Sequence, residues 1–224
     1  MTKKKNLKFI LAFCLVAVVS ALTMAMTGAW FTSNKYVGGT VTMAKVDIKL
    51  YKRKGSTDTL IENNGSTALN VSAALPSAKI LFNDDASNQL VIKSAECTTS
   101  VYLRMTVFVT TAAINGKWIS QSADDTTVNL TPTGWKQYGS TTSASTGYTV
   151  YTYTYGTAGN AKVEVDAITS GIAVYTSGLW IPNKAVPTAN FNVYIRVDAI
   201  QSTGVGTTAD AIVTAMGGVA TDWA

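Results

Sequence analysis

Acidic side chains are the first candidates for catalysis or metal binding in this chain, and they are few and scattered. Two adjacent pairs, Asp84-Asp85 and Asp124-Asp125, offer the carboxylate oxygens that Ca²⁺ prefers as ligands. Neither pair has the spaced ligands of a calcium-binding loop. Because Asp also stabilises turns through its own side-chain hydrogen bonds, we interpret both pairs as solvated turn residues.

A third acidic pair, Glu164 and Asp166, lies in the strand-like stretch Lys162–Ile168. Glycosidases place two carboxylates on opposite sides of a cleft. Residues two positions apart on a strand are instead neighbours on one face. The spacing of this pair therefore gives no support to a glycosidase.

Histidine is absent from the sequence. That absence excludes Ser-His-Asp and Cys-His catalysis, the zinc proteases with a His-Glu-x-x-His motif, and imidazole metal sites. The sequence also lacks a phosphate-binding loop, a Cys-x-x-Cys motif and a Gly-x-Ser-x-Gly motif. We therefore expect no enzyme activity, no catalytic residue, no metal site and no cofactor.

The two cysteines, Cys14 and Cys97, do not predict a disulfide within the chain. Cys14 lies in the N-terminal segment that we expect to be removed, which leaves Cys97 alone. A single cysteine can pair between chains. Since free cysteine is among the most buried residue types, we favour Cys97 as a small buried side chain.

Aromatic residues are the remaining candidates for ligand binding. They comprise Trp118, Trp135, Trp180 and the tyrosine-rich stretch Tyr148–Tyr155. Such residues could line a carbohydrate-binding face, but aromatic cross-strand pairs also stabilise sheets without any ligand. We favour packing and keep carbohydrate binding as the alternative.

The N-terminal segment has the three parts of a secretory signal: basic residues, an apolar run and a small-residue exit. Four lysines, the last being Lys8, precede the charge-free run Phe9–Ala29. We expect cleavage between Ala29 and Trp30. The run is also long enough to span a bilayer, so a retained anchor is the alternative. The net charge of +5 comes mainly from these lysines and does not indicate nucleic-acid binding.

After the signal, apolar and polar residues alternate in many short stretches, which predicts an all-β fold. We expect two antiparallel sheets packed as a β-sandwich of the jelly-roll type, in a single domain over residues 30–224. Asn64-Gly65 predicts a hairpin turn, Thr133–Ala144 a loop, and Ala209–Met216 the only modest helix. The expected strands are Val46–Leu50, Lys79–Phe82, Gln89–Lys93, Ser100–Thr111, Tyr148–Tyr155, Lys162–Ile168, Ile172–Tyr175 and Phe191–Ile200.

Three of these strands show which face should be buried. The inward residues are expected to be Val46, Ile48 and Leu50 in the first strand, Val101, Leu103, Met105, Val107 and Val109 in the fourth, and Phe191, Val193, Ile195, Val197 and Ala199 in the last.

Three stretches together resemble a known family. They are Thr27–Ser33 with Gly39–Leu50, then Asn88–Val109, which contains Ser-Val-Tyr-Leu-Arg-Met-Thr-Val, and finally Asn192–Gln201, which ends in Ala-Ile-Gln. This pattern is similar to the TasA/camelysin family of secreted proteins from Gram-positive bacteria, which are matured by a SipW-type signal peptidase. The chain departs from the family at Pro76-Ser77, where Pro-Gly is usual, and at 95–97, where Asn-x-Gly is usual.

The resemblance implies a jelly-roll subunit of extracellular or biofilm-matrix fibres, assembled head to tail by donor-strand exchange. The donor would be the mature N-terminal arm, residues 30–43, released by cleavage. The expected assembly residues of this arm are Trp30, Phe31, Tyr36, Val37, Val41 and Met43. Camelysins have been classed as metallopeptidases, an activity that this histidine-free chain does not support.

The sequence therefore favours a secreted structural protein that polymerises with itself at the cell surface or in a matrix. Its other expected partners are the signal peptidase and, beyond that, matrix proteins or the cell wall, with no nucleic acid. Two alternatives stay open. The arm could fold back as the first strand of its own sheet, or the protein could be a monomeric surface module that binds carbohydrate or acts as an adhesin.

Overall fold

The computed structural model describes residues 46–61, 69–71, 77–80, 89–143, 146–176 and 178–219. All of them belong to one compact unit, Met43–Ala224. The second unit, Met1–Thr42, lies outside the described residues, as do the predicted Asn64-Gly65 turn and the acidic pair Asp84-Asp85.

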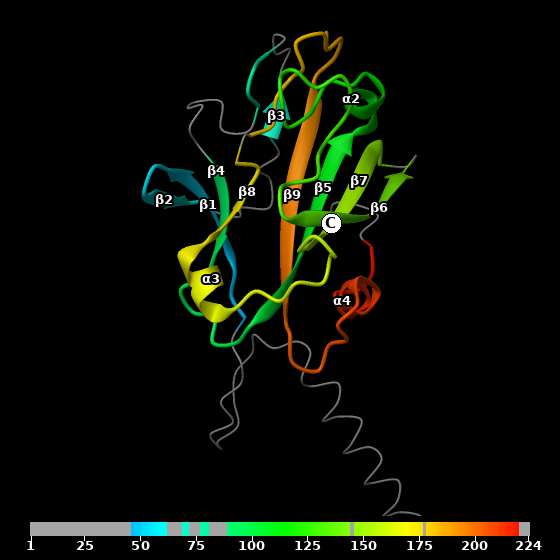
Figure 1. Cartoon of the computed structure of the whole chain (residues 1–224). Helices are drawn as coiled ribbons and strands as arrows, with labels where there is room; N and C mark the ends of the chain where they lie inside the picture. Colours follow the sequence, from blue (N-terminus) through cyan, green and yellow to red (C-terminus); the bar gives the residue numbers. More distant parts are fainter. Residues whose placement is uncertain are drawn as a thin grey trace, which may run out of the picture. The chain divides into compact units, whose positions relative to one another are not determined.

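The described strands form two antiparallel sheets, which confirms the predicted all-β class (Figure 1). Sheet A has the strand order β2-β1-β4-β8 and sheet B the order β3-β9-β5-β7-β6. The strands of sheet A are β1 (Lys49–Lys54), β2 (Thr57–Leu60), β4 (Gln89–Lys93) and β8 (Ile172–Val174). Those of sheet B are β3 (Leu69–Val71), β5 (Val101–Thr110), β6 (Trp135–Ser143), β7 (Tyr148–Tyr155) and β9 (Phe191–Gln201).

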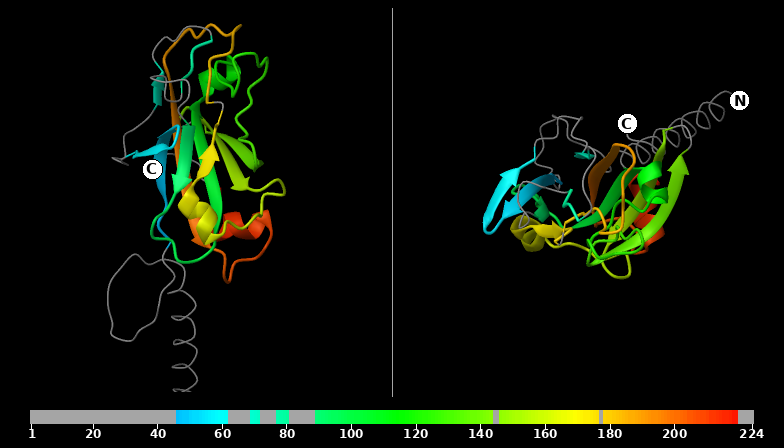
Figure 2. Two further views of the ribbon diagram at one scale, coloured as in Figure 1. Left: turned by 60° about the vertical axis from the view of Figure 1, so that its left-hand side comes forward. Right: turned by 90° about the horizontal axis from the view of Figure 1, so that it is seen from above.

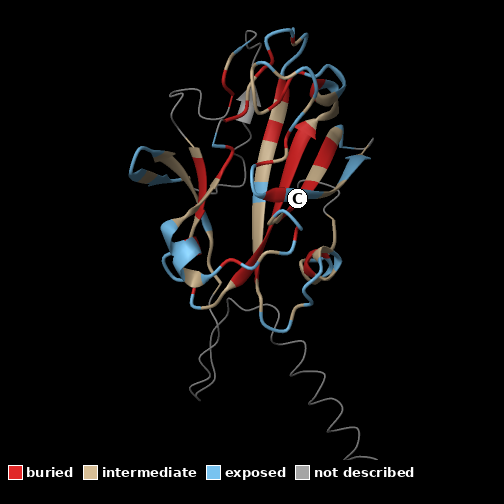
Figure 3. Cartoon of the chain, viewed as in Figure 1, coloured by how far each residue is buried: buried red, intermediate tan, exposed pale blue. Residues whose placement is uncertain are grey.

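Side chains from both sheets share one hydrophobic core, so the sheets form a sandwich. Leu90 and Ile92 of β4 belong to the same cluster as Leu103 and Met105 of β5. Seen from above, β1 and β2 lie on one side of the molecule and β5, β6 and β7 on the other (Figure 2). Burial is densest on β4, β5 and β7 (Figure 3).

The predicted inward faces are confirmed. All five inward residues of β5 and all five of β9 either belong to the core cluster or pack against it, and so do Val46, Ile48 and Leu50. The predicted strands at 89–93 and 148–155 coincide with β4 and β7. Alternation thus placed the side chains of β5, β9 and Leu50 on the correct side of their sheets, whereas Val46 and Ile48 precede β1 and still pack against the core.

Two predicted boundaries were wrong. The first strand was predicted over Val46–Leu50, but β1 begins at Lys49 and continues to Lys54, where Gly55, with a φ of 59°, begins the turn into β2. The predicted loop Thr133–Ala144 is largely strand β6, because its Ser- and Thr-rich residues pair with β7 from Trp135 to Ser143. Its Gly and Ser residues are typical of a loop, but its Trp, Tyr and Thr residues favour a paired strand.

The prediction of a strand over Lys162–Ile168 was also wrong. Only Val163 forms an isolated bridge, with Val101, and helix α3 (Val165–Ser170) follows. The predicted C-terminal helix is α4 (Ala209–Ala215), and a further short helix, α2 (Thr111–Asn115), follows β5. No helix among the described residues has the length and apolar character needed to cross a membrane.

Candidate interaction surfaces of sheet B

Among the described strands, β9 pairs with one neighbour over residues 193–201 and with the other over residues 191–193 only. Its partner β5 runs antiparallel to it from Val101↔Gln201 to Val109↔Val193. On the opposite side, β3 pairs only with residues 191–193. No described strand pairs with the rest of that side, Tyr194–Gln201, which we call the open margin of β9.

The inward side chains along the open margin are only half-buried. Ile195, Val197 and Ala199 pack against the core cluster but remain partly exposed. Their neighbours across the pair, Met105 and Val107 of β5, have 0% exposure. The core of sheet B is therefore closed at β5 and incomplete at β9.

Sheet A contributes similar side chains. Val46, Ile48 and Leu50 pack against the same core and are also half-buried, although Leu50 pairs with the fully buried Ile92. Each sheet thus leaves part of its inward apolar surface incompletely covered by the described residues.

The other sheet edges are less suited to receive a strand. A bulge between Gln137 and Gly139 interrupts β6, which also carries the exposed Lys136. Strand β8 has three residues, and β2 has four. Bulges, charges and short length are the usual protections of sheet edges. Among the described strands, the open margin of β9 is a regular edge of eight residues without a bulge, and its two charged residues, Arg196 and Asp198, pair with each other.

On the face of sheet B opposite the core, an ion pair joins β5 to β9. Arg104, whose side chain is 4% exposed, lies with Nη2 at 2.8 Å from Oδ2 of Asp198. Arg196 contacts the other oxygen of Asp198 through Nε at 2.9 Å. Loss of either partner would leave a nearly buried charge uncompensated, so the ion pair should favour the pairing of β5 with β9.

A second charge cluster lies on sheet A. Asp58 of β2 accepts hydrogen bonds from Arg53 Nε at 2.6 Å and from Lys93 Nζ at 2.9 Å. The bond from Arg53 is the main cause that holds the pKa of Asp58 well below its ordinary value. Arg53 also donates to the carbonyl of Ser170, at the end of α3. These contacts join β1, β2, β4 and α3, which is a structural role.

The described acidic pairs do not form a site. Asp125 accepts a hydrogen bond from Ser120 Oγ, and Asp124 accepts one from Asn183 Nδ2 at 2.7 Å. Glu164 is the N-cap of α3 and Asp166 lies in its first turn, so they do not share a strand face as predicted. Within the described ranges, no group of three or more Cys, Asp or Glu residues is placed to hold a metal ion.

The aromatic residues mostly serve the core. Trp118 and Trp135 are buried, and Trp135 meets Tyr155 edge to face at 5.3 Å. Tyr153 has 0% exposure, and burial raises the pKa of its phenol. Tyr151, Tyr153 and Tyr155 all pack in or against the core, so they do not form an exposed row that could stack on a sugar ring.

The predicted cleavage site, Ala29 and Trp30, lies outside the described residues, as do the predicted assembly residues of the arm. Cys97 is buried, and its thiol donates to the carbonyl of Thr99 at 3.1 Å. The open margin was missed by the sequence analysis. Its only signal was the long alternating run that ends at Gln201, which gives no information on the strand beside it.

Comparison of the chain with protein families, with curated proteins and with solved structures gives no match.

Proposed function

We propose that this protein is a secreted structural subunit that polymerises head to tail into extracellular or cell-surface filaments by accepting a strand from a neighbouring copy. The open margin of β9 carries the proposal. It combines a strand edge with which no described strand pairs and the partly exposed inward side chains of Ile195, Val197 and Ala199. An added strand would complete both the hydrogen bonding of the sheet and the cover of the core.

The N-terminal arm has the pattern that this margin needs. Val37, Val41 and Met43 fall at alternate positions with Gly39, so a strand over 37–43 would place them on one face and Thr40 with Thr42 on the other. The margin, Tyr194–Gln201, spans about 26 Å at roughly 3.3 Å per residue. An extended arm of similar length fits this span.

Removal of the signal would supply the switch for assembly. Cleavage after Ala29 would free the arm, whereas an uncleaved segment would hold it at the membrane. A donor strand passed from one copy to the next is a heterologous contact that does not close on itself, so it generates filaments. In this proposal the protein acts outside the cell, with its own copies and a SipW-type peptidase as its partners.

We also propose that the sandwich is of the jelly-roll type. In support, the chain crosses repeatedly between the sheets: β1 and β2 lie in sheet A, β3 in sheet B, β4 in sheet A, β5 to β7 in sheet B, β8 in sheet A and β9 in sheet B. Such crossing is typical of Greek-key connections.

Negative-stain microscopy tests the function. The Trp30–Ala224 form at high concentration should give filaments, and the same form without residues 30–43 should stay monomeric. A shortened form that is supplied with a peptide of residues 30–43 should bind it but not elongate. Monomers in every sample would reject filament assembly and favour a monomeric binding module. Monomers with the arm protected would indicate that it folds into its own sheet.

A further inference from the structure

The solvent side of sheet B contains a patch that is buried as deeply as the core. Thr106 and Phe108 of β5 pair with Thr152 and Val150 of β7, and all four residues have 0% exposure. They alternate with the inward residues of their strands, so they lie on the face opposite the core. We call these four residues the outer patch. Phe and Val on a sheet face reach zero exposure only when another segment covers them.

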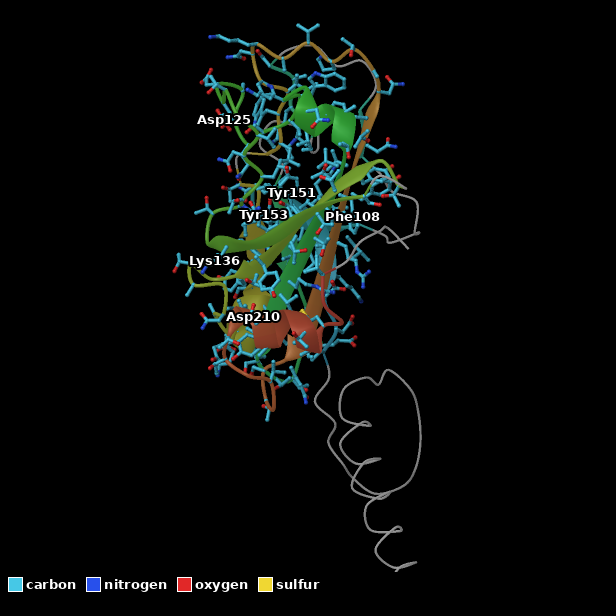
Figure 4. The ribbon with its side chains drawn as sticks, turned by 90° about the vertical axis from the view of Figure 1, so that its right-hand side faces the viewer. Phe108, Asp125, Lys136, Tyr151, Tyr153 and Asp210 are labelled. Carbon is cyan, nitrogen blue, oxygen red and sulfur yellow. The ribbon has the colours of Figure 1, made fainter. Side chains whose placement is uncertain are left out.

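The described elements on this face lie around the patch. Towards one end of the sheet, Ile212 of α4 packs against Tyr102 and Ile200. Towards the other end, the rings of Tyr148 and Tyr194 meet edge to face at 5.6 Å. Figure 4 shows Phe108 in the middle of the sheet, with Asp210 of α4 at its lower end. The outer patch lies between these two borders.

The outer patch also contains polar groups that need hydrogen-bond partners. The hydroxyls of Thr106 and Thr152 are buried without a hydrogen-bond partner among the described residues. An unpaired buried hydroxyl is costly in free energy, so a purely apolar cover would be a poor solution. A segment with both apolar and polar groups fits the patch better.

The chain after α4 is directed at this patch. Gly217 and Gly218 have φ values of 86° and 82°, and their amides donate to the carbonyls of Thr214 and Val213. This left-handed ending turns the chain back towards the sheet. The carbonyl of Gly218 then accepts a hydrogen bond from Arg104. Along β5, Arg104 is the next residue on the outer face after Tyr102 and is therefore closer to the patch. The described chain thus ends near Arg104, on the face of sheet B that carries Thr106 and Phe108.

We infer that the C-terminal segment, residues 219–224, covers the outer patch of its own chain and places Trp223 against Phe108. Trp223 lies five positions after Gly218, so an extended segment can reach about 17 Å from Gly218. Phe108 lies four positions after Arg104, which is about 13 Å along the strand. The segment supplies the required mixture, since Val219, Ala220 and Trp223 are apolar while Thr221 and Asp222 carry polar groups.

This packing is independent of filament assembly, because it uses the outer face of sheet B and not the open margin of β9. It gives the C-terminal segment a role as a permanent cover that keeps a Thr- and Phe-bearing face away from other molecules. Exposure of that face would create an adhesive surface, so loss of the segment should also cause non-specific association.

A double-mutant cycle in the full chain tests the inference. Trp223→Ala should lower the Tm by about 5–10 °C, because an aromatic side chain is lost from a buried contact. Phe108→Leu should lower the Tm by a few degrees. If the two rings touch, the double variant should fall several degrees short of the sum of the single effects. Trp30→Ala, a tryptophan of the N-terminal arm, is the matched control and should be additive with Phe108→Leu.

Three other outcomes would each reject the packing of the C-terminal segment on its own chain. Additive effects of Trp223→Ala and Phe108→Leu would overturn the inference, and so would coupling of Phe108 with Trp30, since the arm would then be the cover. A coupling that disappears on dilution would assign the cover to the C-terminal segment of a second copy and would reject the packing within one chain.

Discussion

Strands β5 and β9 are neighbours in sheet B and have the same alternation of five inward apolar residues, but their burial differs. Met105 and Val107 of β5 are fully buried, whereas Val197 and Ile195, which face them across the pair, are half-exposed. The difference lies in their other neighbours. β5 has β7 on its far side over Arg104–Thr110, whereas the far side of β9 pairs, among the described strands, with β3 alone and over residues 191–193.

The same sequence pattern can therefore build a closed core or leave a place for another strand. Alternation determines which face of a strand is apolar. The strand on its far side determines whether that face is completed. The filament proposal follows from the second property, since the missing neighbour of β9 is a position that another copy could fill.

The largest contrast should come from a charge placed on each strand. We expect Val107→Lys to prevent folding, because an ammonium group in the closed core has no partner or access to water. Val197→Lys should fold, because its long side chain can reach solvent at the open margin. Circular dichroism and gel filtration distinguish the two variants.

The folded Val197→Lys variant should not form filaments, because a charge would face the core-side residues of the incoming strand. Filaments of normal length from Val197→Lys would show that assembly does not use the open margin. Failure of Val197→Lys to fold would show that β9 is as closed as β5.

A milder pair of substitutions should give a smaller contrast. Val107→Ala should lower the free energy of unfolding by about 2 kcal/mol, from lost burial and the cavity that remains. Val197→Ala should cost about 1 kcal/mol or less in the monomer, because this side chain is already partly exposed to water. Urea unfolding measures both. Equal losses at the two positions would remove the basis for treating the strands differently.

The smallest effect concerns the charge cluster of sheet A, which lies away from both strands. The folded pKa of Asp58 is depressed, so the folded state binds fewer protons than the unfolded state as the pH falls through about 4. The stability due to this carboxylate is present above that pH and is lost as acid is added. The Tm should therefore decrease between about pH 5 and pH 3.

Asp58→Asn is the matched variant for this effect. It should be less stable than the natural chain at pH 7 and should show a shallower decrease in Tm on acidification. Neither change should alter filament assembly. Identical pH profiles for the two chains would mean that the contacts of Asp58 with Arg53 and Lys93 do not stabilise the fold.

The sequence was sufficient for much of the fold because its strongest strands are regular. The inward residues of β5 and β9 and the strands β4 and β7 could be predicted from alternation alone. Strand β6 was missed because Gly139 and the neighbouring serines are typical of a loop, although its Trp, Tyr and Thr residues favour strands and pair with β7. Helix α3 was missed because only Ile168 on it is buried, which leaves no helical stripe in the sequence.

The candidate surfaces were harder to predict because they depend on contacts between distant segments. The open margin follows from the shortness of β3, and the outer patch from the burial of Thr106 and Phe108 on a face that alternation assigns to solvent. The sequence analysis predicted a donor arm, but no local pattern could indicate the edge that would receive it.

Hydrogen–deuterium exchange on the Trp30–Ala224 form, before and after filaments appear, tests the central claim most directly. The amides of Tyr194–Gln201 that face away from β5 should become protected on assembly, because the incoming strand pairs with them. Amides of β5 should be protected in both states and serve as the internal control. Filaments that leave Tyr194–Gln201 unchanged, or that protect the edge of β6 or β8 instead, would contradict the account.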